Sequence, residues 1–136
     1  MTKAVLRVMD ANLNRVREGF RVCEDISRFI KNNSKMTSQF KSARHELSRI
    51  ILSGLVPSRE LLSARESYRD VGKKSYIKNS KKVDEFSLMT ANLKRVEEGL
   101  RVLEECSKIA RPKAAPKFQA LRFKIYELEK SVAKKF

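Results

Sequence analysis

Apolar residues recur every three or four positions along most of the chain, a spacing that matches one face of an α-helix. The first periodic segment runs over about residues 2–32 and ends where the sequence KNNSK interrupts it. A second helix is predicted to begin after an N-cap at Thr37 or Ser38 and to stop at Gly54. The alternation typical of a β-strand is absent, so the pattern predicts an all-α protein.

The second half of the chain carries the same kind of pattern. Ser58 is expected to cap a short helix, after which residues 66–82 lose all apolar periodicity and form the one long loop. A second long helix is predicted to start at Ser87, or in the preceding DEF sequence, and to end before Pro112. A last helix follows Pro116, with leucine, isoleucine and valine at coiled-coil spacing.

The two long helical segments repeat one another. Residues 9–30 and 89–110 share 12 identities in 22 positions, and ANLNRVREGFRV in the first answers to ANLKRVEEGLRV in the second. A fainter likeness continues into FKSARHEL and FQALRFKI. Each copy is a helix hairpin with an apolar stripe that it cannot bury alone. We therefore predict a pseudo-twofold four-helix bundle with a short extra helix.

The length of 136 residues fits a single domain. Its predicted parts are repeat one at about 2–53, a connector at about 54–84 and repeat two at about 85–136. Cys23 and Cys106 match no metal-binding spacing and are interpreted as core thiols. No apolar run approaches the roughly 20 residues of a membrane span, and the N-terminus has no signal-peptide pattern, so we expect no membrane association and a cytoplasmic protein.

The balance of charge suggests negatively charged ligands. Lys and Arg number 31 against 16 Asp and Glu, which gives a formal net charge of +15. Such a field attracts polyanions or phosphorylated small molecules. The few aromatic residues recur at helix spacing and do not interleave with basic residues as a base-stacking surface would. Nucleic acid is therefore the weaker of these two expectations.

The repeated motif places polar residues where a packed helix would carry apolar ones. Asn12, Arg15 and Gly19 lie in a row within the apolar arc of the first helix, and the second copy repeats them. A glycine inside a helix costs about 0.5–1 kcal/mol relative to alanine, so it indicates close approach of another helix or of a ligand. The polar groups either bond their counterparts, Asn92 and Arg95, across the twofold, or form an anion pocket between the long helices.

The stretches MDANLNRVREGFRVCEDISRF, ARHEL, ARESYRDVG and ANLKRVEEGLRVLEECSK resemble a known family. It is the small helical domain fused ahead of the barrel in some thiamine-phosphate synthases, which also occurs as a stand-alone protein. The resemblance implies a hydroxymethylpyrimidine phosphate kinase, unrelated to the ribokinase-type enzyme, that uses ATP to make the pyrophosphate for thiamine assembly. We expect this chain to be the stand-alone form, without a synthase barrel, and Arg65-Glu66 stands where the family usually has arginine-aspartate.

Phosphoryl transfer needs positioning and neutralisation of phosphate charge, with Mg²⁺ bridging the phosphates of ATP. The chain has no glycine-rich phosphate loop, so side chains must hold the nucleotide. Arginine suits this task because it is always charged and binds phosphate through two donors. The candidate catalytic residues are Arg15, Arg95, Glu18 and Glu98. The candidate substrate-binding and phosphate-binding residues are Asn12, Asn92, Arg21, Arg101, Arg44, Arg65, Arg122, Asp70 and Gly72.

Several candidates have a second interpretation. Glu18, Glu98 and Asp70 are candidate Mg²⁺ ligands, but for each glutamate the pattern favours a plain ion pair with an arginine three residues away on its helix. Arg44 and Arg122 could pair with the repeat glutamates across each hairpin. The RDVG sequence at residues 69–72 is a turn or a phosphate-binding lid, with Lys73 and Lys74 approaching the nucleotide. In each case the same side chains either contact one another within the protein or bind a metal ion or a phosphate group.

Three functions follow. The first is an ATP-dependent and Mg²⁺-dependent kinase acting on a small phosphorylated pyrimidine. The second is a non-catalytic module that binds a phosphorylated pyrimidine or a thiamine-phosphate synthase partner. The third is a basic nucleic-acid binder, whose affinity would fall steeply with salt. The sequence leaves open which repeat would hold the nucleotide and whether the chain forms a homodimer.

Overall fold

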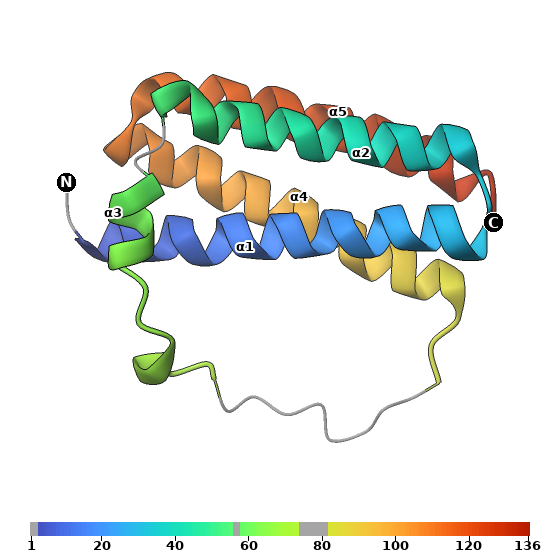
Figure 1. The fold of residues 1–136 in the computed structure, drawn as a ribbon, viewed down its shortest axis with the longest axis horizontal. Coiled ribbons are helices and arrows are strands. Elements are labelled where there is room, and N and C mark those ends of the chain that lie inside the picture. The colour runs from blue at the N-terminus through green and yellow to red at the C-terminus, as the bar shows by residue number, and fades with distance from the viewer. Residues whose placement is uncertain (1–2, 56–57, 74–81) are drawn as a thin grey trace.

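The computed structural model describes residues 3–55, 58–73 and 82–136, and within them helices are the only regular secondary structure (Figure 1). The prediction of an all-α protein is thus confirmed for this part of the chain. No helix in it combines the length and the apolar character needed to cross a bilayer. The α-helices are α1 (Lys3–Asp25), α2 (Ser34–Ile50), α3 (Ser58–Ser63), α4 (Glu85–Ala110) and α5 (Ala115–Ala133).

Two antiparallel hairpins, α1 with α2 and α4 with α5, form the body of the molecule. In Figure 1, α2 and α5 lie side by side above α1 and α4, and α3 lies against one end of α1. The most extensive contact between any two elements is that of α1 with α4. The two helices that carry the repeated motif are therefore direct neighbours, which is what places their polar residues together.

The helix ends agree with the sequence prediction at most positions, but not at the start of α2. Asn33 is the N-cap, and its side-chain oxygen accepts a hydrogen bond from the Met36 backbone N–H at 2.9 Å. The expected N-cap at Thr37 or Ser38 was wrong because both residues lie inside the first turns, where the Thr37 hydroxyl donates to the Asn33 carbonyl. Asparagine caps as well as serine, so KNNSK both ends one helix and starts the next.

The first helix ends in a π-helical turn, Ile26–Ile30, close to its predicted end at Asn32. Asn32 takes a positive φ of 49°, a conformation that asparagine tolerates better than most residues. At the other long helix, Asp84 caps α4 by accepting from the Ser87 backbone N–H at 2.7 Å. The predicted start within the DEF sequence is thus confirmed.

The repeated glycines allow α1 and α4 to approach closely. A Cβ added at Gly19 would lie 2.8 Å from Cγ2 of Val96, and one added at Gly99 would lie 2.5 Å from Cγ2 of Val16. Both distances are below any normal carbon contact, so neither position has room for a side chain. Of the two reasons that the sequence left open for these glycines, contact between helices is therefore sufficient.

The core fills the space between the four long helices. Phe20, Phe40 and Phe118 are fully buried, each on a different helix. Cys23 lies in the same core, and burial raises the pKa of its thiol to about 12, so it stays protonated. Both cysteines are free thiols, as the interpretation of Cys23 and Cys106 as core residues requires, although Cys106 is only half-buried.

Candidate functional site

A cleft of about 490 Å³ lies where α1 crosses α4. Arg15 and Glu18 enter it from α1, and Asn92 and Arg95 enter it from α4. Arg15 and Arg95 are 80 positions apart in the chain and meet because the glycines let the two helices approach. The cleft lining consists of Ala11, Asn14, Arg15, Glu18, Gly19, Val22, Asn92 and Arg95.

Each asparagine of the motif holds the arginine of its own helix. Asn12 is buried, donates to the Val8 carbonyl and accepts from Arg15 Nη1 at 2.8 Å. Asn92 likewise donates to the Leu88 carbonyl and accepts from Arg95 Nη1 at 3.4 Å. The first of the two interpretations, bonds between the counterparts on the two helices, is therefore not what these side chains form, since each asparagine bonds within its own helix. The amide N–H of each buried asparagine donates to a backbone carbonyl, which leaves its oxygen pointing at the arginine. The hydrogen bond from the arginine to that oxygen then fixes the direction of the exposed guanidinium group.

Four charged groups of the motif, Arg15, Glu18, Arg95 and Glu98, have no oppositely charged partner in the described part of the chain. Arg15 and Arg95 are exposed, and no ion pair to either is found among the described residues. The same holds for Glu18 and Glu98. The expected pairing of these glutamates along the helix does not form.

Arg21 and Arg101, two of the arginines considered as partners of Glu18 and Glu98, form ion pairs with other glutamates. Arg21 lies 3.9 Å from Glu24, and Arg101 lies 3.1 Å from Glu105. The guanidinium groups of Arg15 and Arg95 thus face one cleft, and within the described residues no carboxylate neutralises their charge.

A second cleft, of about 420 Å³, adjoins the first and shares Ala11, Asn14 and Glu18 with it. Its far side is formed by Arg7 of α1 and by residues of the connector. Arg65 donates two hydrogen bonds to the Asp10 carboxylate, at 2.7 and 2.9 Å, and this contact raises the pKa of the guanidinium. The connector is thereby tied to α1, and its first residues become a wall of the cleft.

The RDVG sequence forms a turn at the edge of this second cleft. Asp70 accepts a hydrogen bond from the Gly72 backbone N–H at 2.8 Å, and Asp70 also lines the cleft. Lys73 places its ammonium group 4.7 Å from the centre of the Tyr68 ring. Lys74, the other lysine expected near a nucleotide, lies outside the described residues. The turn interpretation thus describes the backbone, and Asp70 still faces the space where a ligand could bind.

Arg122 is buried and Arg44 is half-buried, and each forms an ion pair across its own hairpin. Arg44 Nε lies 2.8 Å from Glu24, and Arg122 Nη2 lies 2.8 Å from Glu104. Burial opposes ionisation of Glu24, but the hydrogen bond and charge of Arg44 outweigh it and lower the pKa of that carboxyl. This is the structural interpretation considered for the two arginines, and it leaves little of their charge for a ligand.

Residues of repeat two form a separate pocket between α4 and α5. Glu98, Arg101 and Arg122 line this space of about 350 Å³ together with Lys94, Glu97 and Tyr126. The candidate residues that line a space are therefore divided between the clefts over α1 and this pocket, whereas Asn12, Arg21, Arg44 and Gly72 line none of the three. The sequence analysis did not name Arg7, which lies before the repeat, or Asn14, which is replaced by Lys94 in the second copy. Asp10 could have been found, because an acidic residue in one copy and Thr90 in the other mark a position where the two copies differ in function.

Two further observations limit the site. No group of three or more His, Cys, Asp or Glu residues that could hold a metal occurs in the described part of the chain.

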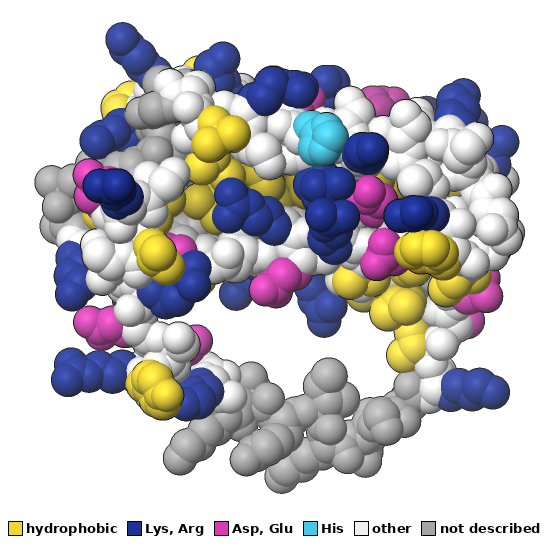
Figure 2. Space-filling view, in the orientation of Figure 1, with side chains coloured by type: hydrophobic (Ala, Val, Ile, Leu, Met, Phe, Trp, Pro, Cys, Tyr) yellow, Lys and Arg dark blue, Asp and Glu magenta, His cyan; other side chains and the backbone are white. Residues whose placement is uncertain are grey.

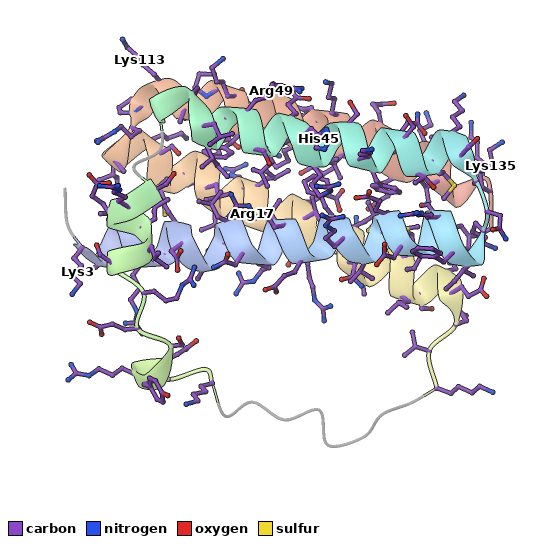
Figure 3. All side chains as sticks on the ribbon, in the orientation of Figure 1. Lys3, Arg17, His45, Arg49, Lys113 and Lys135 are labelled. Carbon is purple, nitrogen blue, oxygen red and sulfur yellow. The ribbon has the colours of Figure 1, made fainter. Side chains whose placement is uncertain are left out.

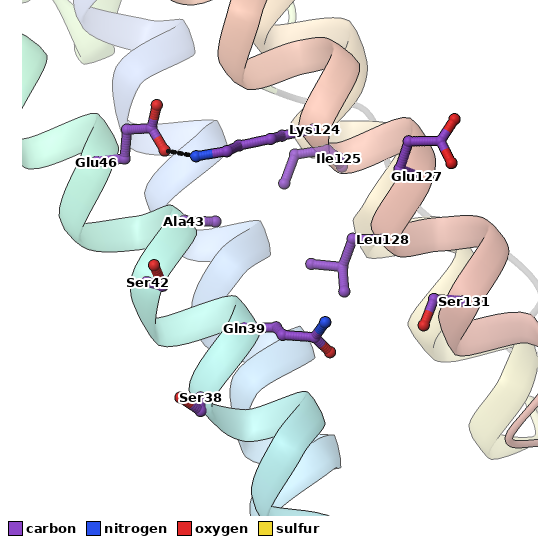
Figure 4. Close-up of a pocket in the computed structure, with 10 residues that line it drawn as sticks. All are labelled: Ser38, Gln39, Ser42, Ala43, Glu46, Lys124, Ile125, Glu127, Leu128 and Ser131. Carbon is purple, nitrogen blue, oxygen red and sulfur yellow. Dashed lines mark hydrogen bonds and ion pairs between the residues drawn. The ribbon is translucent and has the colours of Figure 1, made fainter.

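The groove between α2 and α5, of about 450 Å³, is crossed by an ion pair between Lys124 and Glu46 (Figure 4). Its lining combines the apolar Ala43, Ile125 and Leu128 with the charged Glu46, Lys124 and Glu127, and the first two of these charges pair with each other.

The excess positive charge is distributed over the surface. Figure 2 shows Lys and Arg side chains over the whole visible face, with Asp and Glu between them. Figure 3 marks Lys3 and Lys135 at opposite ends of the bundle and Arg49 on α2. The net charge alone therefore does not indicate a site, whereas the unpaired arginines of the α1–α4 cleft do.

Comparison with known proteins identifies the family. The model of the ThiD2 family matches residues 7–131. A thiamine-phosphate synthase of Nostoc punctiforme is 36% identical over 131 residues, which are 96% of this chain and 36% of that protein. Proteins of the same name from Synechocystis sp. and Rhodopirellula baltica are 37% and 32% identical, over 93% and 97% of this chain and 35% and 36% of their own.

The chain thus spans about a third of the length of these relatives. No solved structure matches it. The relatives are named for a step of thiamine biosynthesis, and the resemblance seen in the sequence motifs is confirmed. Since the family model covers nearly the whole chain, this protein belongs to the ThiD2 family.

Proposed function

We propose that the protein transfers the γ-phosphate of ATP to hydroxymethylpyrimidine phosphate and so produces the pyrophosphate used in thiamine biosynthesis. One observation carries the proposal: Arg15 and Arg95, from the two copies of the motif, face one cleft without an ion-pair partner among the described residues. Membership of the ThiD2 family and relatives named thiamine-phosphate synthase support the same pathway.

The chemistry of the transfer suits these residues. An oxygen of the acceptor phosphate bonds to the γ-phosphorus of ATP, the bond from that phosphorus to the β,γ-bridging oxygen breaks, and ADP keeps the electron pair. The acceptor is mostly a dianion at neutral pH, so the protein needs no general base. It must instead overcome the repulsion between two highly charged phosphates. Arg15 and Arg95 supply fixed positive charge where those phosphates would meet.

Glu18 is placed between the two clefts over α1. Its carboxylate is exposed, has no ion-pair partner in the described residues and lines both spaces. Mg²⁺ is commonly bound through one or two carboxylates and the phosphates of the substrate, so a cluster of three protein ligands is not required. Mg²⁺ would be held by Glu18 and would neutralise phosphate charge there. Two adjoining spaces also provide room for two phosphate-bearing ligands.

The test is an assay of ADP release with ATP, Mg²⁺ and hydroxymethylpyrimidine phosphate. We expect ADP to form only when the acceptor is present, together with an equal amount of the pyrimidine pyrophosphate. Release of ADP at the same rate without acceptor would contradict the proposal. Tight binding of the acceptor with no turnover would favour the alternative, a ligand-binding module that serves a synthase.

The variant Glu18→Gln tests the metal-binding role separately. It keeps the size of the side chain and removes the negative charge that would hold Mg²⁺. We expect the concentration of Mg²⁺ needed for half-maximal activity to rise about tenfold or more. An unchanged Mg²⁺ dependence would exclude Glu18 as a ligand.

A further inference from the structure

One stripe of charged residues on α1 holds the first residues of the connector. Lys3, Arg7 and Asp10 follow one another at helix spacing, and each of them contacts Arg65 or Glu66. Arg7 Nη2 donates to the Glu66 carbonyl at 3.0 Å, and Lys3 Nζ lies 3.6 Å from the Glu66 carboxylate. The uncharged residues at the corresponding positions of repeat two are Val83, Ser87 and Thr90. Repeat two thus forms its hairpin without these charges, so helix packing alone does not require them.

Asp10 is the buried member of this stripe and holds one edge of a guanidinium group. Its side chain is 10% exposed and accepts from Nε and Nη2 of Arg65 at 2.7 and 2.9 Å. Two parallel hydrogen bonds to one carboxylate fix the plane of a guanidinium. They leave the Nη1 group and the second N–H of Nη2 without a partner among the described residues. The Arg65 side chain is 44% exposed and lines the second cleft, so these donors are accessible to a ligand there.

Arg44 shows what the same contact does when it serves packing alone. Arg44 also binds a carboxylate, that of Glu24, through Nε and Nη2. Its side chain, however, is only 17% exposed, and it lines neither cleft over α1. The pair of Asp10 with Arg65 differs because the carboxylate is buried while the arginine stands at the edge of an open space. A buried carboxylate thus presents the free edge of an exposed arginine to a cleft.

The second cleft offers further donors beside Arg65. Arg7 is half-buried, lines the cleft and bonds a backbone carbonyl, and no carboxylate pairs with it among the described residues. Asn14 lines this cleft and the first one. Glu18 and Asp70 line it as well, so its walls carry both signs of charge. Anion binding here therefore depends on donors that are correctly aimed, and an excess of positive charge does not provide it.

We propose that the second cleft binds a phosphate group through Arg65 and Arg7, and that Asp10 is a positioning residue that aims the free edge of the Arg65 guanidinium at this phosphate. Arginine binds phosphate best through two parallel N–H groups, which is what the free edge of Arg65 provides. Under the function proposed above, on which the identity of the ligand rests, the phosphate belongs to the nucleotide or to the pyrimidine acceptor. The shared chemistry is a phosphate group, and the experiment separates the two sources.

Equilibrium binding without Mg²⁺ tests the phosphate site, with ADP and hydroxymethylpyrimidine phosphate added one at a time. Arg65→Gln should weaken binding of one of them by about 10- to 100-fold, because it removes a charged pair of donors. The ligand that is more strongly affected identifies the source. Arg59→Gln is the matched control, since Arg59 is exposed on α3 and lines neither cleft over α1. It should change either affinity by less than about twofold, because salt screens a charge that does not contact the ligand.

Wild-type affinity of Arg65→Gln for both probes, or an equal loss in Arg59→Gln, would overturn the proposal. Asp10→Asn then tests the positioning role by the sign of its effect. It removes a negative charge from the cleft wall, so by charge alone it would tighten binding of an anion. Loss of positioning instead weakens binding, by about 3- to 10-fold. Asp10→Asn should cause no further loss in the Arg65→Gln background, because it acts through Arg65. Tighter binding, or the same loss in that background, would contradict the positioning role.

These measurements need no phosphoryl transfer, so the two proposals fail separately. If Arg65→Gln loses affinity but the wild type forms no ADP from ATP, the phosphate site stands and the kinase function fails. If ADP is formed and Arg65→Gln binds both probes like the wild type, the kinase function stands and the phosphate site fails. Thermal unfolding checks that each variant is folded at the assay temperature. Should Asp10→Asn not fold, Arg65→Lys decides: it keeps the charge but loses the second parallel donor, and it should bind the affected probe more weakly than the wild type.

Discussion

The polar faces of α1 and α4 carry the same asparagine, arginine, glutamate and glycine, but their surroundings differ. On α1, Asp10 holds Arg65 of the connector and so closes one side of a cleft. On α4 the same position is Thr90, which cannot form such an ion pair, and the buried carboxyl of Glu97 faces α5. The repeated arginines Arg15 and Arg95 and the repeated glycines meet at the helix crossing, whereas Asp10 and Glu97, which differ between the copies, lie beside it.

This difference separates two requirements on the repeat. Residues at the crossing must suit both helices at once, because each glycine contacts the valine of the other copy. Residues beside the crossing contact only their own neighbours and can differ without loss of packing. The proposed phosphate cleft, which holds Arg15 and Arg95, belongs to the first group.

The largest effect is expected at the buried ion pairs, which differ in burial between the repeats. Arg122 and Glu104 are 8% and 7% exposed, whereas Arg44 and Glu24 are 17% and 8% exposed. Arg122→Met leaves a buried carboxylate unpaired and should lower the free energy of unfolding by about 3–5 kcal/mol. Arg44→Met should cost less, about 1–3 kcal/mol. Urea denaturation measures both, and equal losses would contradict the comparison.

The next effect concerns activity. Arg15→Ala and Arg95→Ala should each lower kcat/KM of the proposed kinase by about 10²–10³-fold, because each removes a charged donor from the site of transfer. Both side chains are exposed, so the melting temperature should hardly change. Arg17→Ala is the matched control, since Arg17 is exposed on α1 and lines neither cleft over that helix. A similar loss in all three variants would indicate a general effect of charge.

A smaller effect is expected at the glycines. Gly99→Ala places a methyl group 2.5 Å from Cγ2 of Val16, and overpacking of this kind costs about 1–3 kcal/mol, against a gain of about 0.5–1 kcal/mol in helix propensity. We expect a net loss of stability by thermal unfolding. The double variant Gly99→Ala with Val16→Ala should recover part of it, because the clashing atom is gone. No recovery would mean that the backbone, and not Val16, limits the approach.

The smallest expected effect is the change of the free energy of unfolding with pH. The folded state raises the pKa of Glu97 from 4.5 to about 7, so it holds this proton more tightly than the unfolded state does. The resulting stabilisation is complete below pH 4.5 and is lost as the pH rises through 7. Its slope is at most about 1.4 kcal/mol per pH unit for one proton. Urea unfolding at several pH values should show this slope in wild type and a shallower one in Glu97→Gln.

Much of the fold could be predicted from the sequence because helix periodicity and the internal repeat are local patterns. The ends of α4 followed from the DEF sequence and Pro112, whereas the start of α2 did not, since several residues near Asn33 could serve as a cap. The choice depends on where the chain must turn to pack, which no local pattern contains.

The candidate site was predictable only in part. The repeat pointed to Arg15 and Arg95, which do share a cleft. It could not show that Asn12 bonds within its own helix, because both arrangements satisfy the same donors. Arg7 and Glu97 lie outside the identical positions, and their significance depends on contacts with the connector and with α5. Only the tertiary structure brings those segments together.

The bare glycine positions at the crossing also bear on protein engineering. Replacing a helical glycine with alanine is a common way to raise heat resistance, yet here the separation of the two helix axes sets the span between the guanidinium groups of Arg15 and Arg95. A single added carbon would widen that span. The melting temperature and the distance between the two guanidinium groups thus both depend on the separation of α1 and α4. A substitution selected to change one of them would therefore also change the other.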